Sequence, residues 1–301
     1  MENRDRPTRR HRVLLGFMLK AELDAVLRQT SFALTDPNAK AADVWRISRE
    51  ARGRLDPLAG ANIEPLPVEL EEPARLVRER SSYRLHYERV AEYEFGLAPI
   101  DALLTPQFSA DTDYVDELAS LLENDPSPSA VFDFSMPSGR LTPPIISANT
   151  VIFSSSRLDL FASPIPLVRP TDQGGYEITV EAQSRPNLLQ VAVYKDRLIL
   201  TNGVHKALAL QRKGITTIPC VWRKVNAIDE VGLPQAGFEM FKMPVLEGSR
   251  PALVADFLNE AVSPTFVQPA TNQVLRLAIN VESFSVPLPF TAAAPVGQET
   301  S

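Results

Sequence analysis

Apolar residues recur at helical spacing along most of the N-terminal third of the chain. Residues 19–27 and 41–55 repeat apolar positions every three or four places. The stretch 74–95 is dense in Arg and Glu and carries one stripe of apolar and aromatic residues, which is typical of a long helix with surface ion pairs. We therefore predict a helical region over residues 1–94, interrupted by the prolines between 56 and 73.

Beyond residue 95 the pattern alternates between strand and helix. A short apolar strand begins near residue 96, and residues 113–125 follow as a helix with Asp113 as its N-cap. Residues 125–144 are rich in Pro and Ser and predict an exposed loop. Strand-like runs then follow at 149–155, 176–182, 188–194 and 197–201. Lys195-Asp196 between the last two runs predicts a tight hairpin.

The segment "LILTNGVHKALALQRKGITTIPCVW" joins a strand, a helix and a second strand. The apolar strand runs into Asn202-Gly203, the helix opens with His205-Lys206, and Gly214 marks its end. Residues 215–223 predict a buried strand. After residue 228 we predict a helix over 249–261, a half-buried strand over 275–281 and a loose Pro/Ala-rich tail.

These elements predict an α+β fold in three regions. The first is the helical N-terminal region with a basic arm, residues 1–94. The second is an α+β domain with a mixed sheet over 95–228, which contains an insertion at about 125–185. The third is a C-terminal extension, 229–301, with one helix and one strand.

Composition and charge exclude a protein that coats DNA through general electrostatics. The 301 residues are 44% hydrophobic and 23% charged, and the net charge is −6. Non-specific affinity for nucleic acid comes from neutralising phosphates, which needs a basic balance. Any nucleic-acid contact must therefore come from a local basic patch, for which the arm from Arg4 to Arg12 is the candidate. The more common role of such an arm is a solvated surface.

Cysteine usage and hydropathy predict a cytoplasmic setting with no membrane contact. Cys220 is the single cysteine, so an internal disulfide is excluded and a reducing compartment is favoured. No apolar run reaches the ~18 residues of a membrane span. The apolar run 13–19 follows a basic head but lacks a small-residue cleavage site, so it does not predict a signal peptide.

The turn at residues 201–206 carries the residue types of an anion site. The start of a helix presents free backbone N–H groups and a partial positive charge. Gly203 lets the backbone approach a ligand, and Thr201 and Asn202 offer side-chain hydrogen bonds. His205 and Lys206 oppose the helix dipole, so a bound phosphate would explain them better than helix stability does. The alternative is an Asn-Gly turn with two solvated side chains that point away from the core.

This segment resembles the core of the ParB/sulfiredoxin-like superfamily. The resemblance rests on the order Gly, His, Lys, Ala, Gly, Ile-Pro, which falls here on Gly203, His205, Lys206, Ala209, Gly214 and Ile218-Pro219. The upstream stretch "APIDALLTPQ…YVDELASLL" resembles the family's opening strand and first helix. The likeness covers residues 95–225 and leaves out both ends of the chain.

The resemblance implies a compact α+β domain that binds a nucleotide phosphate at this helix start, with CTP or ATP and Mg²⁺ as the ligands. Residues Thr201, Asn202, Gly203, His205 and Lys206 would hold it. Val204 occupies the position of the sulfiredoxin cysteine and of the partition-protein glutamate. Sulfinic-acid repair is therefore not expected, because the thiolate nucleophile is missing.

No other constellation predicts chemistry. The three histidines are scattered and no zinc spacing occurs, so we predict no metal ligands and assign no catalytic residue. The acidic residues Asp111, Asp113, Asp116 and Glu117 could hold Mg²⁺, but helix capping is the more common use of such a cluster.

Three functions stay open from the sequence. The first is a nucleotide-binding regulatory or switch module. The second is a degenerate ParB-like domain that serves as a structural or interaction subunit of a larger assembly. The third is an enzyme acting on a phosphate bond, a nuclease or NTPase. We also predict that a protein partner, or a second copy, binds through the N-terminal helices.

Overall fold

The computed structural model of the chain has an α+β fold with mixed sheets, which confirms the predicted fold class. The structure describes the following residues: 7–80, 83–84, 87, 93–138, 143–147, 149–155, 160–162, 166–184, 187–231, 243–271 and 273–278. Parts of three predictions lie outside these residues: the start of the basic arm, several residues between 81 and 92 of the predicted long helix, and the C-terminal tail.

The chain divides into two compact units. Unit 1 comprises Met1–Arg140 and Ser184–Thr271, and unit 2 comprises Leu141–Gln183 and Asn272–Ser301. Unit 2 therefore takes most of the predicted insertion and the end of the predicted C-terminal extension. The boundaries differ from the three predicted regions because strand pairing joins all three of those regions within unit 1.

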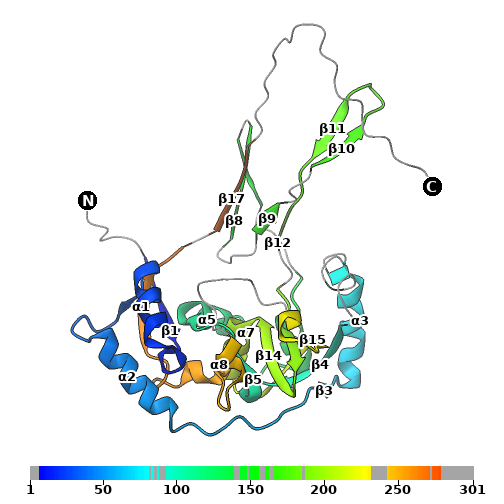
Figure 1. Cartoon of the computed structure of the whole chain (residues 1–301). Coiled ribbons are helices and arrows are strands. Elements are labelled where there is room, and N and C mark those ends of the chain that lie inside the picture. The colour runs from blue at the N-terminus through cyan, green and yellow to red at the C-terminus, as the bar shows by residue number, and fades with distance from the viewer. Residues whose placement is uncertain are drawn as a thin grey trace, which may run out of the picture. The chain divides into compact units, whose positions relative to one another are not determined.

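The larger sheet of unit 1 has six strands in the order β3–β4–β15–β13–β14–β5 (Figure 1). Their bounds are Glu64–Pro65 for β3, Glu94–Pro99 for β4, Leu103–Leu104 for β5, Gln190–Tyr194 for β13, Arg197–Asn202 for β14 and Thr217–Lys224 for β15. The sheet is mixed: β13 runs parallel to β15, and β14 runs parallel to β5. The helix α7, Val204–Arg212, carries the chain from β14 past β13 to β15.

The hairpin β13–β14 confirms the turn predicted at Lys195-Asp196. Both residues have positive φ angles, 47° and 60°, as the tight two-residue turn of a hairpin requires. The turn pairs Tyr194 with Arg197. Val191 and Leu200 are completely buried in the middle of the hairpin, so the apolar runs predicted as strands form the centre of the sheet.

The basic arm is a strand, which corrects the prediction of an all-helical N-terminal region. Residues Thr8–Val13 form β1, which lies between β16, Thr265–Pro269, and β6, Ser109–Asp111, in a four-stranded sheet. The fourth strand, β2, is Ala33–Leu34. Arginines lie on both faces of β1, so its sequence does not alternate between apolar and polar residues. Acidic side chains of neighbouring elements form ion pairs with these arginines.

The helices follow the predicted periodicity in most places. Their bounds are Lys20–Gln29 for α1, Ala41–Arg52 for α2, Glu71–Glu79 for α3, Thr112–Ser120 for α5, Pro128–Ser135 for α6, Val204–Arg212 for α7 and Met243–Glu247 for α8. Short 3₁₀ turns occur at Leu15–Phe17 (η1), Val68–Leu70 (η2), Ile100–Ala102 (η4), Ile228–Val231 (η5) and Val254–Leu258 (η6). In α5 the N-cap is Asp111, whose side chain accepts the N–H of Tyr114, and not the predicted Asp113.

Three helix predictions were wrong. The long helix predicted over 74–95 ends at Glu79, because Arg80 is extended, and Glu94 and Phe95 belong to the strand β4. The segment 125–144, predicted as a loop, contains α6, which begins at the N-cap Ser127 with Pro128 in its first turn and buries Val131 and Phe132. The helix predicted over 249–261 reduces to the 3₁₀ turn η6. There Asp256 accepts the N–H of Leu253 and an ion pair from Arg250.

The core of unit 1 lies between its sheets and helices. Phe17, Leu103, Leu198, Leu208 and Phe257 are each at most 2% exposed and belong to one continuous apolar cluster. Its members come from the N-terminal helices, the six-stranded sheet, α7 and η6. The N-terminal region is therefore part of this core and not a separate attachment.

Unit 2 consists of short β-strands. One three-stranded antiparallel sheet has the order β17–β8–β7, with bounds Gln273–Ala278, Thr150–Ser155 and Ile145–Ser147. A hairpin joins β10, Leu167–Pro170, to β11, Tyr176–Thr179 (Figure 1). A third pair joins β9, Leu160–Ala162, to β12, Ala182–Ser184.

Candidate site at the start of helix α7

The predicted anion site begins at a glycine that the fold requires. Gly203 lies between β14 and α7 with φ +102°, a conformation that L side chains rarely adopt. A Cβ at this position would stand 2.3 Å from Cδ2 of Leu189. The close approach for which a glycine was predicted is therefore made to the protein's own Leu189.

The side chains of Thr201 and Asn202 bond to the neighbouring strand. The Thr201 hydroxyl donates to the carbonyl oxygen of Gln190 at 3.1 Å, and the Asn202 amide donates to that of Leu188 at 2.9 Å. These bonds hold the end of β14 to the residues that lead into β13.

Lys206 is buried, which contradicts the expectation that its side chain points away from the core. Its side chain belongs to a residue only 4% exposed, and its Nζ donates to the carbonyl oxygens of Ser135 and Asn187. Ser135 ends α6, where carbonyls lack helical partners and the helix dipole is negative. A buried ammonium needs such acceptors, so Lys206 ties the start of α7 to the end of α6.

His205 also turns inward, toward the start of α5. Its Nε2 accepts the backbone N–H of Asp111 at 3.0 Å, so in the neutral ring the proton lies on Nδ1. The ring meets Tyr114 edge-on at 5.4 Å. Burial lowers the pKa of His205 to about 4, Asp111 opposes this shift, and His11 adds to it. At neutral pH this residue is therefore uncharged and supplies no cation for a phosphate.

His11 joins this site from β1, and the sequence analysis did not identify it. Its Cα partner in the sheet is Asp111, so both residues lie beside His205. Burial lowers the pKa of His11, while Asp111 and Asp113 raise it. Within the described structure its Nδ1 is buried without a hydrogen-bond partner. No periodic signal in the sequence marks a strand at this position, which is why the pairing was missed.

The arginines of β1 are neutralised by acidic side chains of α5 and of the segment before β16. Arg9 pairs with Glu117 at 3.0 Å and Arg10 with Asp113 at 2.6 Å. Arg12 pairs with Glu260 at 2.7 Å. The part of the basic arm that the structure describes therefore does not present a free cationic surface to nucleic acid.

The acidic cluster is also accounted for by contacts within the protein. Asp111 caps α5, and Asp113, Asp116 and Glu117 pair with arginines of β1 or α7, including Arg212. Among the residues that the structure describes, no group of three or more His, Cys, Asp or Glu side chains is placed to hold a metal ion.

Cys220 lies in β15 and is completely buried, as the sequence predicted. Burial raises the pKa of its thiol well above the usual range, which disfavours the reactive thiolate.

Comparisons with known proteins give no relative of this chain. No family, no curated protein and no solved structure matches it. Over the described part of the chain, every helix is too short or too polar to cross a membrane. The function must therefore be argued from the geometry.

Proposed function

We propose that this chain is a self-associating interaction subunit of a larger assembly, built on a degenerate ParB/sulfiredoxin-like domain, and that unit 2 makes the contact. The observation that carries the proposal is an exposed apolar face on the β10–β11 hairpin. The β14–α7–β15 arrangement of unit 1 has the order of elements that the ParB-like resemblance implies, which supports the choice of domain.

The apolar face of the hairpin is formed by two cross-strand pairs. Val168 lies opposite Ile178, and Pro170 lies opposite Tyr176. The exposed fractions are 53% for Val168, 67% for Ile178 and 74% for Tyr176. Side chains two apart share one face of a strand, so these four residues form one surface.

Such a face is costly to leave in water. A two-stranded hairpin is at best marginally stable by itself, and a contiguous exposed apolar surface is typical of an interaction site. Burying one large apolar side chain contributes about 1.5–3 kcal/mol. The face carries no charge, so it is complementary to the same face of a second copy, as a two-fold symmetric contact requires.

The α7 site supports a degenerate domain. Thr201, Asn202 and Lys206 donate to carbonyl oxygens of this chain, and His205 accepts a backbone N–H. The side chains that a phosphate would need thus stabilise the junction of β14, α5, α6 and α7.

Sedimentation velocity of the full chain over a range of concentrations tests the proposal. We expect reversible association that the pair Tyr176→Ser and Ile178→Thr abolishes. The matched control is Arg169→Gln with Glu177→Gln, a cross-strand pair on the opposite face of the same hairpin. A chain that stays monomeric at all concentrations, or an apolar-face variant that associates like wild type, would contradict the proposal.

A second candidate function is binding of the phosphates of CTP or ATP, with Mg²⁺, at the start of α7. It is favoured by one observation: Gly203 opens a nine-residue helix whose first N–H groups have no acceptor within the helix. The ligand would have to rely on backbone N–H groups. A thermal-shift series with CTP, ATP and GTP, with and without MgCl₂, tests it, because a ligand stabilises the fold it binds. Phosphate release in the same samples would reveal an NTPase. The absence of any shift would exclude this candidate.

A further inference from the structure

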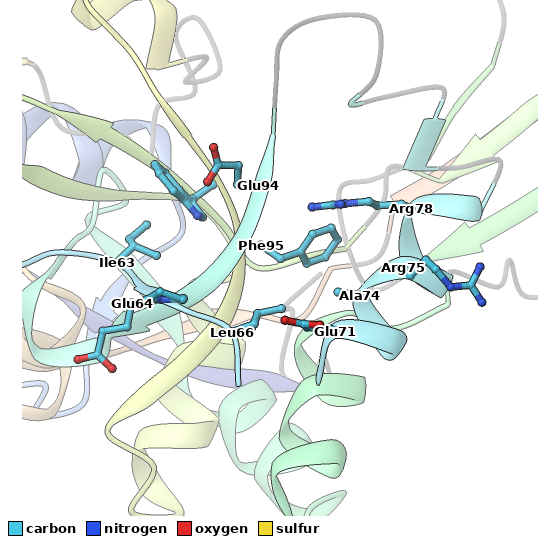
Figure 2. A pocket seen from close by; sticks show the side chains of 11 residues that line it. Ile63, Glu64, Leu66, Glu71, Ala74, Arg75, Arg78, Glu94 and Phe95 are labelled. Atoms are coloured by element: carbon cyan, nitrogen blue, oxygen red, sulfur yellow. The ribbon is translucent and has the colours of Figure 1, made fainter. Parts of the chain in front are cut away.

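A cavity of about 460 Å³ opens at the β3–β4 edge of the six-stranded sheet, next to α3 (Figure 2). Six of the side chains that line it carry the argument: Phe95, Trp222, Arg78, Glu64, Glu71 and Glu94. Cavities of this size hold small ligands or single side chains of a partner. The site lies in unit 1 and is independent of the hairpin face proposed for self-association.

The cavity forms where β3 stops. β3 pairs only with Gly96 and Leu97, so β4 extends past it by Glu94 and Phe95. Gly96 is needed for this closure, because a Cβ there would stand 2.4 Å from Cγ2 of Ile63 and 3.1 Å from Nε1 of Trp222. A sheet edge that continues past its last partner strand is a place where an extended peptide can add.

Aromatic rings supply the apolar part of the site. Phe95 is 9% exposed, and the guanidinium of Arg78 lies 5.1 Å from the centre of its ring. Figure 2 shows Arg78 extended toward Phe95. Trp222 is the cross-strand partner of Glu94, so an indole and a carboxylate share one face of the sheet. An indole next to a carboxylate is well suited to a cationic side chain.

The charges of the cavity select a cation. Arg75 is already neutralised by ion pairs with Glu72 and Glu79. The carboxylates of Glu64, Glu71 and Glu94, by contrast, form no ion pair within the described part of the chain. Arg78 alone remains to balance these three, so the cavity keeps an excess of negative charge.

We propose that this cavity binds an Arg or Lys side chain of an extended basic peptide segment of a partner protein. The peptide lies along the β4 edge beyond β3. Its cationic group contacts Trp222 and the carboxylates, while its backbone continues the sheet.

Fluorescence anisotropy with three labelled peptides tests the proposal on the full chain. The probes are Gly-Ser-Arg-Ile-Arg-Ser-Gly and its counterparts with Gln or Glu in place of both arginines. We expect the arginine peptide to bind more tightly than the Gln peptide, and the Glu peptide not to bind. The affinity should fall as salt is added, because the charges at this edge are partly solvated.

Two variants with a matched control assign the binding to the cavity. The triple change Glu64→Gln, Glu71→Gln and Glu94→Gln should weaken the arginine peptide about tenfold, since each partly exposed ion pair contributes little by itself. The control Glu123→Gln, Asp125→Asn and Glu181→Gln removes the same charge at exposed positions outside the cavity and should leave the affinity unchanged. Arg78→Gln should tighten binding by relieving repulsion.

Three results would overturn the proposal. The first is equal binding of the three peptides, or none. The second is an equal loss of affinity in the triple variant and its control, which would indicate general attraction to the acidic chain. The third is tighter binding of the Glu peptide together with its loss in Arg78→Gln, which would show that the cavity selects an anion.

Discussion

At the scale of single residues, the helix start at α7 shows how the same side chains can serve a ligand or the fold. Lys206 and His205 are the residue types expected beside a phosphate, and both bond to the protein's own backbone instead. The sequence located this turn correctly, because glycine is the residue that most readily adopts the positive φ found at Gly203. It could not give the side-chain directions, since the carbonyl of Ser135 belongs to a helix that the sequence did not predict.

Replacing Lys206 should destabilise the protein. Lys206→Met keeps the length of the side chain but leaves the Ser135 and Asn187 carbonyls without this donor, which should cost about 1–3 kcal/mol. Lys213→Met is the control, because the half-buried Lys213 donates only to the side chain of Asn124 at the surface, and it should change stability by no more than about 0.5 kcal/mol. Urea unfolding of the two variants measures the difference. Equal stability of the two variants would show that the bonds from Lys206 to Ser135 and Asn187 do not stabilise the packing of α7 against α6.

The pH dependence of stability should report His205. Its pKa is about 4 in the folded protein, below the ordinary value of 6.5, because burial disfavours the charged ring. The folded state therefore favours the neutral form, so this stabilisation is fully present above pH 6.5 and is lost as the pH falls toward 4. The loss should approach about 3 kcal/mol. His205→Gln cannot titrate but can still accept the Asp111 N–H, so the fall between pH 6.5 and 4 should be smaller in urea titrations. An unchanged slope would contradict this assignment.

At the scale of elements, β1 is the strongest departure from the sequence prediction. Arginines occupy both faces of β1, so no alternation of apolar and polar residues marks it as a strand. It is stabilised by pairing with β16 and β6 and by acidic side chains of α5, which are all distant in sequence. Periodicity detects local amphipathic elements such as α2 and the β13–β14 hairpin, which were predicted correctly. It cannot detect a strand whose partners are more than ninety residues away along the chain, nor α6, whose buried face spans only two turns.

Removal of β1 should unfold unit 1. Deletion of residues 1–13 would expose the edges of β16 and β6 and remove Val13, which is 1% exposed in the core. We expect aggregation, or loss of the cooperative thermal transition. Deletion of residues 1–6 leaves β1 whole and should unfold like the full chain. Deletion of residues 1–94 would also remove β1, so it could not isolate a role of the N-terminal helices in partner binding. A cooperative thermal transition in the chain without residues 1–13 would show that unit 1 does not need β1 to fold.

The capping of α6 gives a second prediction at this scale. The Ser127 hydroxyl accepts the N–H of Ala130 at 3.2 Å and begins the helix whose last residue, Ser135, receives Lys206. Ser127→Ala should cost about 1 kcal/mol. Ser120→Ala, whose hydroxyl only donates to a carbonyl near the end of α5, should cost less. Thermal unfolding of the two variants measures the difference. An equal loss of stability in both would contradict the role of Ser127 as the N-cap of α6.

At the scale of the whole molecule, the two units have different characters. Unit 1 buries a continuous core, and the side chains of Thr201, Asn202, His205 and Lys206 at its candidate site hydrogen-bond to the protein's own backbone. Unit 2 leaves large apolar residues in solvent on short strands, among them Ile146, Tyr176 and Ile178. Within the predicted insertion, the sequence correctly predicted the strands β8 and β11 from the runs 149–155 and 176–182, but it did not predict their partner strands β7 and β10, which are short. The apolar face emerges only when the register of β10 and β11 is known.

Amide hydrogen exchange of the full chain at low and high protein concentration tests the self-association claim most directly. An isolated hairpin should exchange rapidly, whereas one covered by a second copy should be protected. We predict that protection of residues 167–179 rises with concentration, while that of β13–β14 stays high throughout. Rapid exchange of residues 167–179 at every concentration would show that a second copy does not cover this face.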